Sequence, residues 1–127
     1  MGLDISFYKQ RKGDYNDSHE EVGYFRKVNF IVRYFNLGED DDGRDIELRK
    51  DVFSKFVNDL KVELESRTEL QGEPVNKDLM PIRVFFGGST ECDSYYWEDV
   101  KFVYAWADSL LREFDWENNV LLLNCWW

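Results

Sequence analysis

The sequence predicts a single α+β domain over 1–127, with three helices packed on one mainly antiparallel sheet of three or four strands. Three observations favour this fold class. A chain of 127 residues has room for one hydrophobic core. Three long segments repeat apolar residues at helical spacing, and shorter segments, including both chain ends, alternate or are continuously apolar. We therefore expect the N-terminal and C-terminal strands to belong to the same sheet.

The first two predicted elements are a strand over 3–9 and a helix over 19–37. Apolar and polar residues alternate in the strand, as expected for one buried face. Ser18 and Glu21 match a capping box at the start of the helix, and Gly38 is a suitable C-cap at its end. The apolar stripe of this helix consists of Val22, Phe25, Val28, Val32 and Phe35.

An acidic loop, a short strand and a second helix follow. The acidic run 39–45 differs from an EF-hand, because the sixth residue after Gly43 is Arg49 where a calcium loop requires glutamate. We therefore interpret the run as a solvated loop. A short strand is predicted over 45–48 and a helix over 50–67, the latter from Val52, Phe53, Phe56, Val57, Leu60 and Leu64.

After a polar loop over 68–81, the sequence predicts another strand and the third helix. Apolar residues alternate over 82–86, and Gly87 and Gly88 then permit a sharp turn. The helix is predicted over 94–114. Its buried stripe consists of Trp97, Val100, Val103, Tyr104, Ala107, Leu110, Leu111 and Phe114.

The closing strand, over 120–127, is apolar on both faces, which is typical of a strand buried on both sides or used in an interface. Several aromatic residues of the third helix also lie off its buried stripe. We expect these side chains to pair with a second copy of the chain, giving a homodimer, or with another protein. The predicted interface residues are Tyr95, Phe102, Trp106, Trp126 and Trp127.

Charge and composition limit the classes of partner. The 26 acidic and 16 basic residues give a net charge of −10, which repels nucleic-acid backbones and anionic membranes. We expect a basic or neutral protein partner, with no direct nucleic-acid binding and no membrane binding. Cys92 and Cys125 form no CxxC pair, and no apolar segment approaches the length of a membrane-spanning helix. A cytoplasmic protein without a cofactor fits these features.

The turn between the 82–86 strand and the third helix is the candidate binding surface. A strand, two glycines and a helix N-terminus can present backbone N–H groups to a ligand. Polar residues of the first predicted helix are expected to face this turn. The candidate surface consists of Arg26, Asn29, Arg33, Gly87, Gly88, Ser89, Thr90, Glu91 and Asp93. In an alternative interpretation, one of the two arginines simply pairs with Glu91 or Asp93 and orders the helix.

The residue types at this turn do not identify a reaction. Cys92 as a nucleophile lacks a nearby base, since His19 is the only histidine, and the neighbouring acids would raise the pKa of the thiol. The turn lacks the lysine of a phosphate-binding P-loop. Glu91, Asp93 and Asp4 are suitable oxygen ligands for a divalent metal, but they lack diagnostic spacing. We assign no catalytic residue and no metal ligands.

Segments spread over most of the chain resemble a family of small acidic proteins of bacteria, phages and prophages. These segments are the opening Met-Gly-Leu-Asp, the stretch 21–29, and the stretch from Phe85 to Asp99. The family carries a similar MGLD start, a YWRKAN-like helix and an FFGST-like turn. Relatives of this kind carry histidine at the position of Val32 and tyrosine at that of Cys92. The resemblance implies a phage or mobile-element setting, and it implies no activity.

Two functions of different classes remain open. The first is a small interaction protein that binds another protein through acidic and aromatic surface, with mimicry of nucleic-acid charge as a variant. The second is a small enzyme or ligand-binding domain with its pocket at Gly87-Gly88-Ser89-Thr90, with or without a divalent metal. A concave pocket with converging polar groups at the turn would favour the second, and a flat acidic or aromatic face the first.

Overall fold

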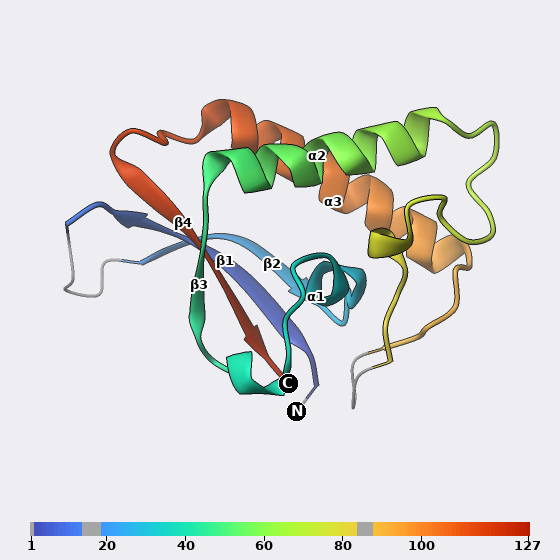
Figure 1. Cartoon of the computed structure of the whole chain (residues 1–127), viewed down its shortest axis with the longest axis horizontal. Helices are drawn as coiled ribbons and strands as arrows, with labels where there is room; N and C mark the ends of the chain where they lie inside the picture. Colours follow the sequence, from blue (N-terminus) through green and yellow to red (C-terminus); the bar gives the residue numbers. More distant parts are fainter. Residues whose placement is uncertain (1, 14–18, 84–87) are drawn as a thin grey trace.

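The computed structural model describes residues 2–13, 19–83 and 88–127. A four-stranded antiparallel sheet with strand order β2-β1-β4-β3 forms one layer (Figure 1). The strands are β1 (Asp4–Arg11), β2 (Glu20–Arg26), β3 (Asp45–Leu48) and β4 (Asn119–Trp126). The three α-helices of the described residues are α1 (Phe30–Tyr34), α2 (Lys50–Glu65) and α3 (Ser94–Glu113), with short 3-10 helices at η1 (Glu39–Asp41) and η2 (Lys77–Leu79).

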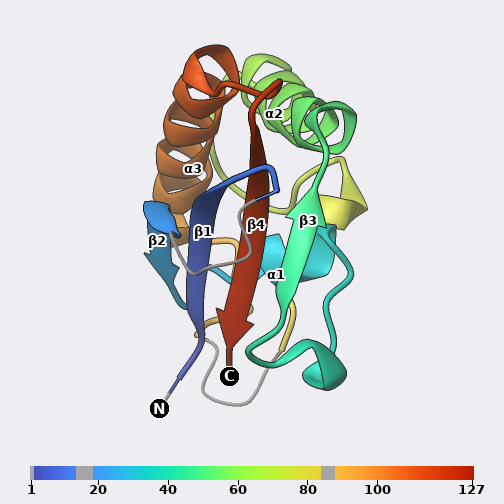
Figure 2. The same ribbon diagram turned by 90° about the vertical axis from the view of Figure 1, so that its left-hand side faces the viewer.

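The predicted fold class is confirmed, and so is the placement of both chain ends in one sheet. β1 and β4 are the two central strands and pair along their full lengths, from Asp4 opposite Trp126 to Arg11 opposite Asn119. Figure 2 shows α3 over the side of the sheet that contains β2 and β1, and α2 over the side that contains β4 and β3. The short strand β3 and the two long helices lie where the apolar patterns predict them.

The predicted helix over 19–37 is wrong for most of its length. Residues 20–26 form the edge strand β2, and only 30–34 are helical. The reason is tertiary packing: Phe25 pairs with Ile5 of β1, and the indole ring of Trp106 lies against Gly23, where an added Cβ would be 2.3 Å from it. A helix would break both contacts. The proposed cap at Ser18 lies outside the described residues.

The predicted strand over 82–86 is also not found where the chain is described. Ile82 and Arg83 belong to no strand, and residues 84–87 lie outside the described residues. The fourth strand of the sheet is therefore β2, from a segment to which the sequence analysis assigned a helix.

A core of aromatic side chains fills the space between the sheet and the helices. The ring of Trp106 on α3 lies 4.7 Å from that of Phe7 on β1 and 5.0 Å from that of Phe25 on β2, measured between centroids. Its indole Nε1 donates a hydrogen bond to the carbonyl oxygen of Val22, at 2.8 Å. Phe53 of α2 packs edge-on to the same indole. These contacts fix α3 against the edge strand β2.

A buried ion pair organises the connection between α2 and α3. Glu63 is only 3% exposed, and its Oε2 accepts a hydrogen bond from Nε of Arg67 at 2.7 Å. The backbone N–H groups of Val75 and Asn76 also donate to this carboxylate, at 3.2 and 2.9 Å. The guanidinium of Arg67 stacks on the ring of Trp97, 4.4 Å from its centroid. The loop after α2 is thereby tied to both long helices.

Hydrogen bonds decide the ionisation of Glu63. Burial alone would raise the pKa of this carboxyl group, but the N–H of Asn76, the guanidinium of Arg67 and the N–H of Val75 lower it further than burial raises it. The net pKa of Glu63 lies below its ordinary value of 4.5. The buried carboxylate is therefore charged and fully partnered at neutral pH.

Candidate functional site

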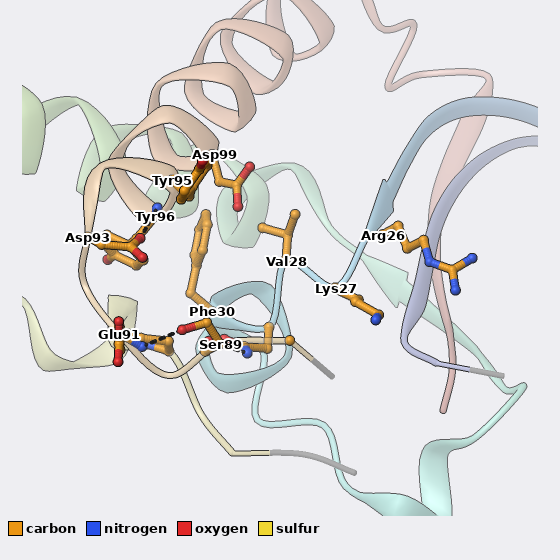
Figure 3. A pocket seen from close by; sticks show the side chains of 13 residues that line it. Arg26, Lys27, Val28, Phe30, Ser89, Glu91, Asp93, Tyr95, Tyr96 and Asp99 are labelled. Atoms are coloured by element: carbon orange, nitrogen blue, oxygen red, sulfur yellow. Dashed lines mark hydrogen bonds between the residues drawn. The ribbon is translucent and has the colours of Figure 1, made fainter. Parts of the chain in front are cut away.

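A pocket lies between the β2–α1 connection and the segment that leads into α3, and we call it the Gly88 pocket. It has a volume of about 280 Å³. Figure 3 shows side chains from both segments around it. Its lining residues are Arg26, Lys27, Val28, Asn29, Phe30, Pro81, Gly88, Ser89, Glu91, Asp93, Tyr95, Tyr96 and Asp99.

Two left-handed backbone positions bring the walls of the pocket together. Lys27, which directly follows β2, has φ +61°, and Gly88 has φ +97°. A Cβ added at Gly88 would lie 2.9 Å from the carbonyl oxygen of Lys27. Glycine is required at 88 both by its backbone conformation and by this close approach.

Asn29 connects the same two segments with its side-chain amide. Its Nδ2 donates to the carbonyl oxygen of Ser89 at 3.0 Å, and its Oδ1 accepts from the N–H of Ile82 at 3.2 Å. Asn29 is only 3% exposed. The structure therefore gives this predicted binding residue a structural role at the floor of the pocket.

One rim of the pocket is acidic. Asp93 is the N-cap of α3, and its Oδ1 accepts a hydrogen bond from the N–H of Tyr96 at 3.0 Å. Ser89 Oγ accepts from the N–H of Glu91 at 3.0 Å, which orders the turn before α3. The carboxylates of Glu91 and Asp99 complete this rim, and we call these three carboxylates the acidic rim. Within the described residues, no basic side chain forms an ion pair with any of them.

The surroundings of Asp99 disfavour its negative charge. Partial burial, followed by the nearby charges of Asp93 and Glu98, raises the pKa of Asp99 above its ordinary value of 3.8. A raised carboxyl pKa means that the protein around Asp99 would be stabilised by a positive charge. This differs from Glu63, whose pKa is lowered by the partners it already has.

The basic residues of the pocket lie on the opposite wall. The guanidinium of Arg26 lies 4.0 Å from the carboxylate of Asp4 on β1, and Figure 3 shows it directed away from Glu91, Asp93 and Asp99. The described ion pairs and hydrogen bonds include none between Arg26 or Arg33 and Glu91 or Asp93, which is the pairing of the alternative interpretation. Asp93 caps α3 with its own carboxylate, without an arginine.

Two of the nine predicted surface residues do not line the Gly88 pocket, and a third lies outside the described residues. Arg33 points toward η2, where its Nε donates to the carbonyl oxygen of Lys77 at 2.8 Å. Thr90 is exposed and does not line the pocket, and Gly87 lies outside the described residues. The other six predicted residues, Arg26, Asn29, Gly88, Ser89, Glu91 and Asp93, all line it.

Exposed aromatic side chains lie beside the acidic rim. Tyr95 lines the pocket and is 79% exposed, and Phe102, two helical turns further along α3, is 66% exposed. Trp106 is partly buried against β2, and Trp127 is partly buried against the core, whereas Trp126 is 57% exposed. Of the five predicted interface aromatics, three are thus available at the surface.

The described contacts of Cys92 and His19 do not bring these two side chains together at the turn before α3. Burial, followed by the charge of Glu73, raises the pKa of the Cys92 thiol. His19 lies near Asp45, with Nε2 3.6 Å from a carboxylate oxygen, and edge-on to Tyr8. The described residues contain no group of three or more His, Cys, Asp or Glu side chains placed to hold a metal ion. None of the described helices has the length and apolarity to cross a membrane.

No protein-family model matches the chain, and comparisons with curated proteins and with solved structures found no match either.

Sequence reasoning missed four lining residues that carry charge or an aromatic ring: Lys27, Phe30, Tyr96 and Asp99. Asp99 had a signal that could have identified it. On a helix that starts at residue 94, residues 95, 99 and 102 recur at the spacing of one face, so Asp99 lies between the two exposed aromatics.

Proposed function

We propose that this protein is a small interaction module that binds another protein through the Gly88 pocket and the exposed aromatic side chains of α3. The observation that carries the proposal is the position of Tyr95 and Phe102, two large and highly exposed aromatics, next to a pocket rimmed by carboxylates that form no ion pair with any described basic residue. Exposed aromatics of this size beside a concave site are typical of protein interfaces.

The size of the pocket supports a side chain of a partner as its occupant. At about 280 Å³, it lies at the lower limit of pockets that enclose a whole organic ligand. A lysine or arginine side chain would place its charge among Glu91, Asp93 and Asp99, and its stem along Phe30 and Tyr95. The net charge of −10 would also favour the approach of a basic partner.

A small cationic ligand is the second candidate function, and the concavity of the Gly88 pocket favours it. The pocket has converging polar groups on one rim and aromatic walls, which also suit a free amine. A free ligand inside the pocket would leave Phe102 exposed, whereas a protein partner would cover both the pocket and Phe102. This difference leads us to place the protein partner first.

The resemblance to small phage and prophage proteins provides a setting for the proposal. In that setting the partner would be a bacterial or phage protein with a basic, partly apolar surface. Such an accessory protein would act by occupying that surface, without chemistry of its own.

Photo-crosslinking in cells tests the proposal. A benzoylphenylalanine in place of Phe102 should give a discrete adduct with one protein, because this position would lie inside the interface. The matched control is the same residue in place of Val62 on α2, which is 55% exposed but lies outside the Gly88 pocket. The adduct at 102 should be lost in the double variant E91Q/D99N. Adducts of equal yield from both positions, or an unchanged adduct in the double variant, would contradict the proposal.

A further inference from the structure

The edge strand β2 has a short stretch of regular backbone that faces away from the sheet. The N–H of Lys27 donates to the carbonyl oxygen of Leu3 at 2.8 Å, so these two residues form a hydrogen-bonded pair of the β1–β2 ladder. In an antiparallel ladder, hydrogen-bonded and non-hydrogen-bonded pairs alternate. By this alternation, the N–H and C=O of Phe25 point toward β1. Those of Tyr24, which lies opposite Ser6, point away from β1.

The other end of β2 is not available in this way. The register shifts opposite Phe7 and Tyr8, so that Val22 forms a bulge, and its carbonyl oxygen accepts the indole N–H of Trp106. Bulges of this kind limit pairing at sheet edges. The regular outer edge is therefore the stretch around Tyr24, next to the Gly88 pocket, which Arg26 also lines.

Exposed aromatic rings flank this edge on both faces of the sheet. The side chain of Tyr24 is 48% exposed, and its hydroxyl donates to Asp4 at 2.5 Å. On the helix side, Phe102 lies edge-on to Phe25, 6.0 Å between centroids, while Trp106 reaches further in, to Phe7 on β1. Phe102 is thus the outer of the two α3 aromatics. A fifth strand paired with β2 would lie about 4.8 Å from it, beside Phe25, and Phe102 would cover that strand.

The charge around the edge is predominantly negative. Glu20 at the start of β2 pairs with Lys9, Glu98 on α3 pairs with Lys101, and Arg26 lies 4.0 Å from Asp4. Glu21 on β2 and Asp99 on α3 have no ion pair among the described interactions, so they supply the excess of negative charge. An approaching segment would gain from positive charge. A second copy of the chain would bring a further −10 charges, so it fits this edge less well than a basic partner.

We propose that the β2 edge at Tyr24 accepts an extended basic segment of the partner as a fifth strand, an inference that rests on the proposed protein-binding function and specifies its mode. The segment would bond to the N–H and C=O of Tyr24, its apolar side chains would pack under Phe102, and a basic side chain would enter the Gly88 pocket. Main-chain bonds would supply affinity, and the pocket would select for positive charge.

The test uses the full chain labelled with ¹⁵N and three capped hexapeptides. The probe alternates valine and arginine. One control peptide has glutamate in place of arginine, and the other keeps the arginines but carries N-methylated valines, which cannot pair along one edge. We expect the probe to slow hydrogen exchange at the Tyr24 amide at least about tenfold, and neither control peptide to do so.

Variants give a second, independent readout. Tyr24→Phe should retain binding of the valine–arginine peptide, whereas Tyr24→Pro, which removes the outward N–H at an edge position, should weaken it at least about tenfold. The inference would be overturned if the N-methylated peptide bound as well as the probe, or if the probe left the Tyr24 amide unprotected. Either result would leave the proposed function standing, because binding in the Gly88 pocket needs no strand pairing. A Tyr24 amide already protected in a dimer without peptide, as seen by light scattering, would also overturn it.

Discussion

Two groups of carboxylates in this protein differ in what surrounds them. Glu63 is buried and accepts hydrogen bonds from Arg67, Val75 and Asn76. In the acidic rim of the Gly88 pocket, Asp93 accepts one helix-capping bond, and no described basic residue pairs with Glu91 or Asp99. The pKa of Glu63 is lowered, and that of Asp99 is raised.

We interpret this difference as that between a structural site and the proposed binding site. The partners of Glu63 all come from the same chain and connect α2 to the loop before α3, so the charge contributes to folding. Among the described interactions, Glu91 and Asp99 of the acidic rim have no such side-chain partners, so we expect their charge to contribute little to folding and to be available to a ligand.

Replacing Glu63 should have the largest effect on stability. Glu63→Gln removes a buried charge and leaves Arg67 partly buried without its counter-ion, which we expect to lower the free energy of unfolding by about 3 to 5 kcal/mol. Urea denaturation followed by far-UV circular dichroism measures this loss. The control Glu65→Gln, on the same helix but exposed, should change stability by less than about 0.5 kcal/mol. Equal losses from the two variants would contradict a structural role for Glu63.

The pH dependence of stability should report the same site. Because the folded pKa of Glu63 lies below its ordinary value of 4.5, its stabilisation is present above pH 4.5 and is lost as the pH falls through the lower, folded pKa. As the pH is lowered from about 7 to 3, the urea midpoint should therefore fall less steeply for Glu63→Gln than for the wild type. Parallel curves for the two proteins would show that Glu63 does not titrate in this way.

Gly88→Ala should have an intermediate effect. The substitution places a side chain at φ +97° and 2.9 Å from the carbonyl oxygen of Lys27. Gly13→Ala is the matched control, since Gly13 also has a left-handed φ, of +78°, but has no atom within 4 Å of an added Cβ. We expect a loss of about 1 to 3 kcal/mol at Gly13 from backbone conformation, and a larger loss at Gly88. Thermal unfolding compares them, and a smaller loss at Gly88 would show that the close approach to Lys27 is unimportant.

Replacing Asp99 of the acidic rim should have the smallest effect on stability. The raised pKa of Asp99 means that ionisation of this group lowers stability as the pH rises, so Asp99→Asn should be neutral or slightly stabilising at pH 7. The side chain is exposed to solvent, and we expect a change within about 0.5 kcal/mol. Below pH 3.8, where the carboxyl is protonated in both states, the difference from wild type should disappear. Clear destabilisation at pH 7 would show that Asp99 has a structural partner.

The sequence predicted the long helices and failed at the edge strand for identifiable physical reasons. The segments of α2 and α3 each sustain one apolar period over four or more turns, which no strand reproduces. In the segment 20–26, the spacing of Val22 and Phe25 suits a helix as well as an irregular strand. The deciding contact, Trp106 against Gly23, comes from a residue far away in the sequence.

The same misassignment explains which of the candidate residues line the Gly88 pocket and which do not. A continuous helix would have placed Arg26, Asn29 and Arg33 on one face. The left-handed turn at Lys27 instead leaves Arg26 on β2 and Asn29 at the pocket floor, and Arg33 on α1 points to η2. The glycine turn before α3 was recognisable from local sequence alone, and Gly88 does lie at the pocket. Asp99 lines the pocket because it shares a face of α3 with Tyr95, a spacing that the sequence already contains.

The most direct measurement compares stability and binding in E63Q and E91Q/D99N, each carrying benzoylphenylalanine at position 102. We predict that E63Q, studied below its lowered melting temperature, retains the crosslinked adduct, while E91Q/D99N retains wild-type stability and loses the adduct. An adduct of wild-type yield in E91Q/D99N would contradict the claim that the carboxylates of Glu91 and Asp99 bind a partner.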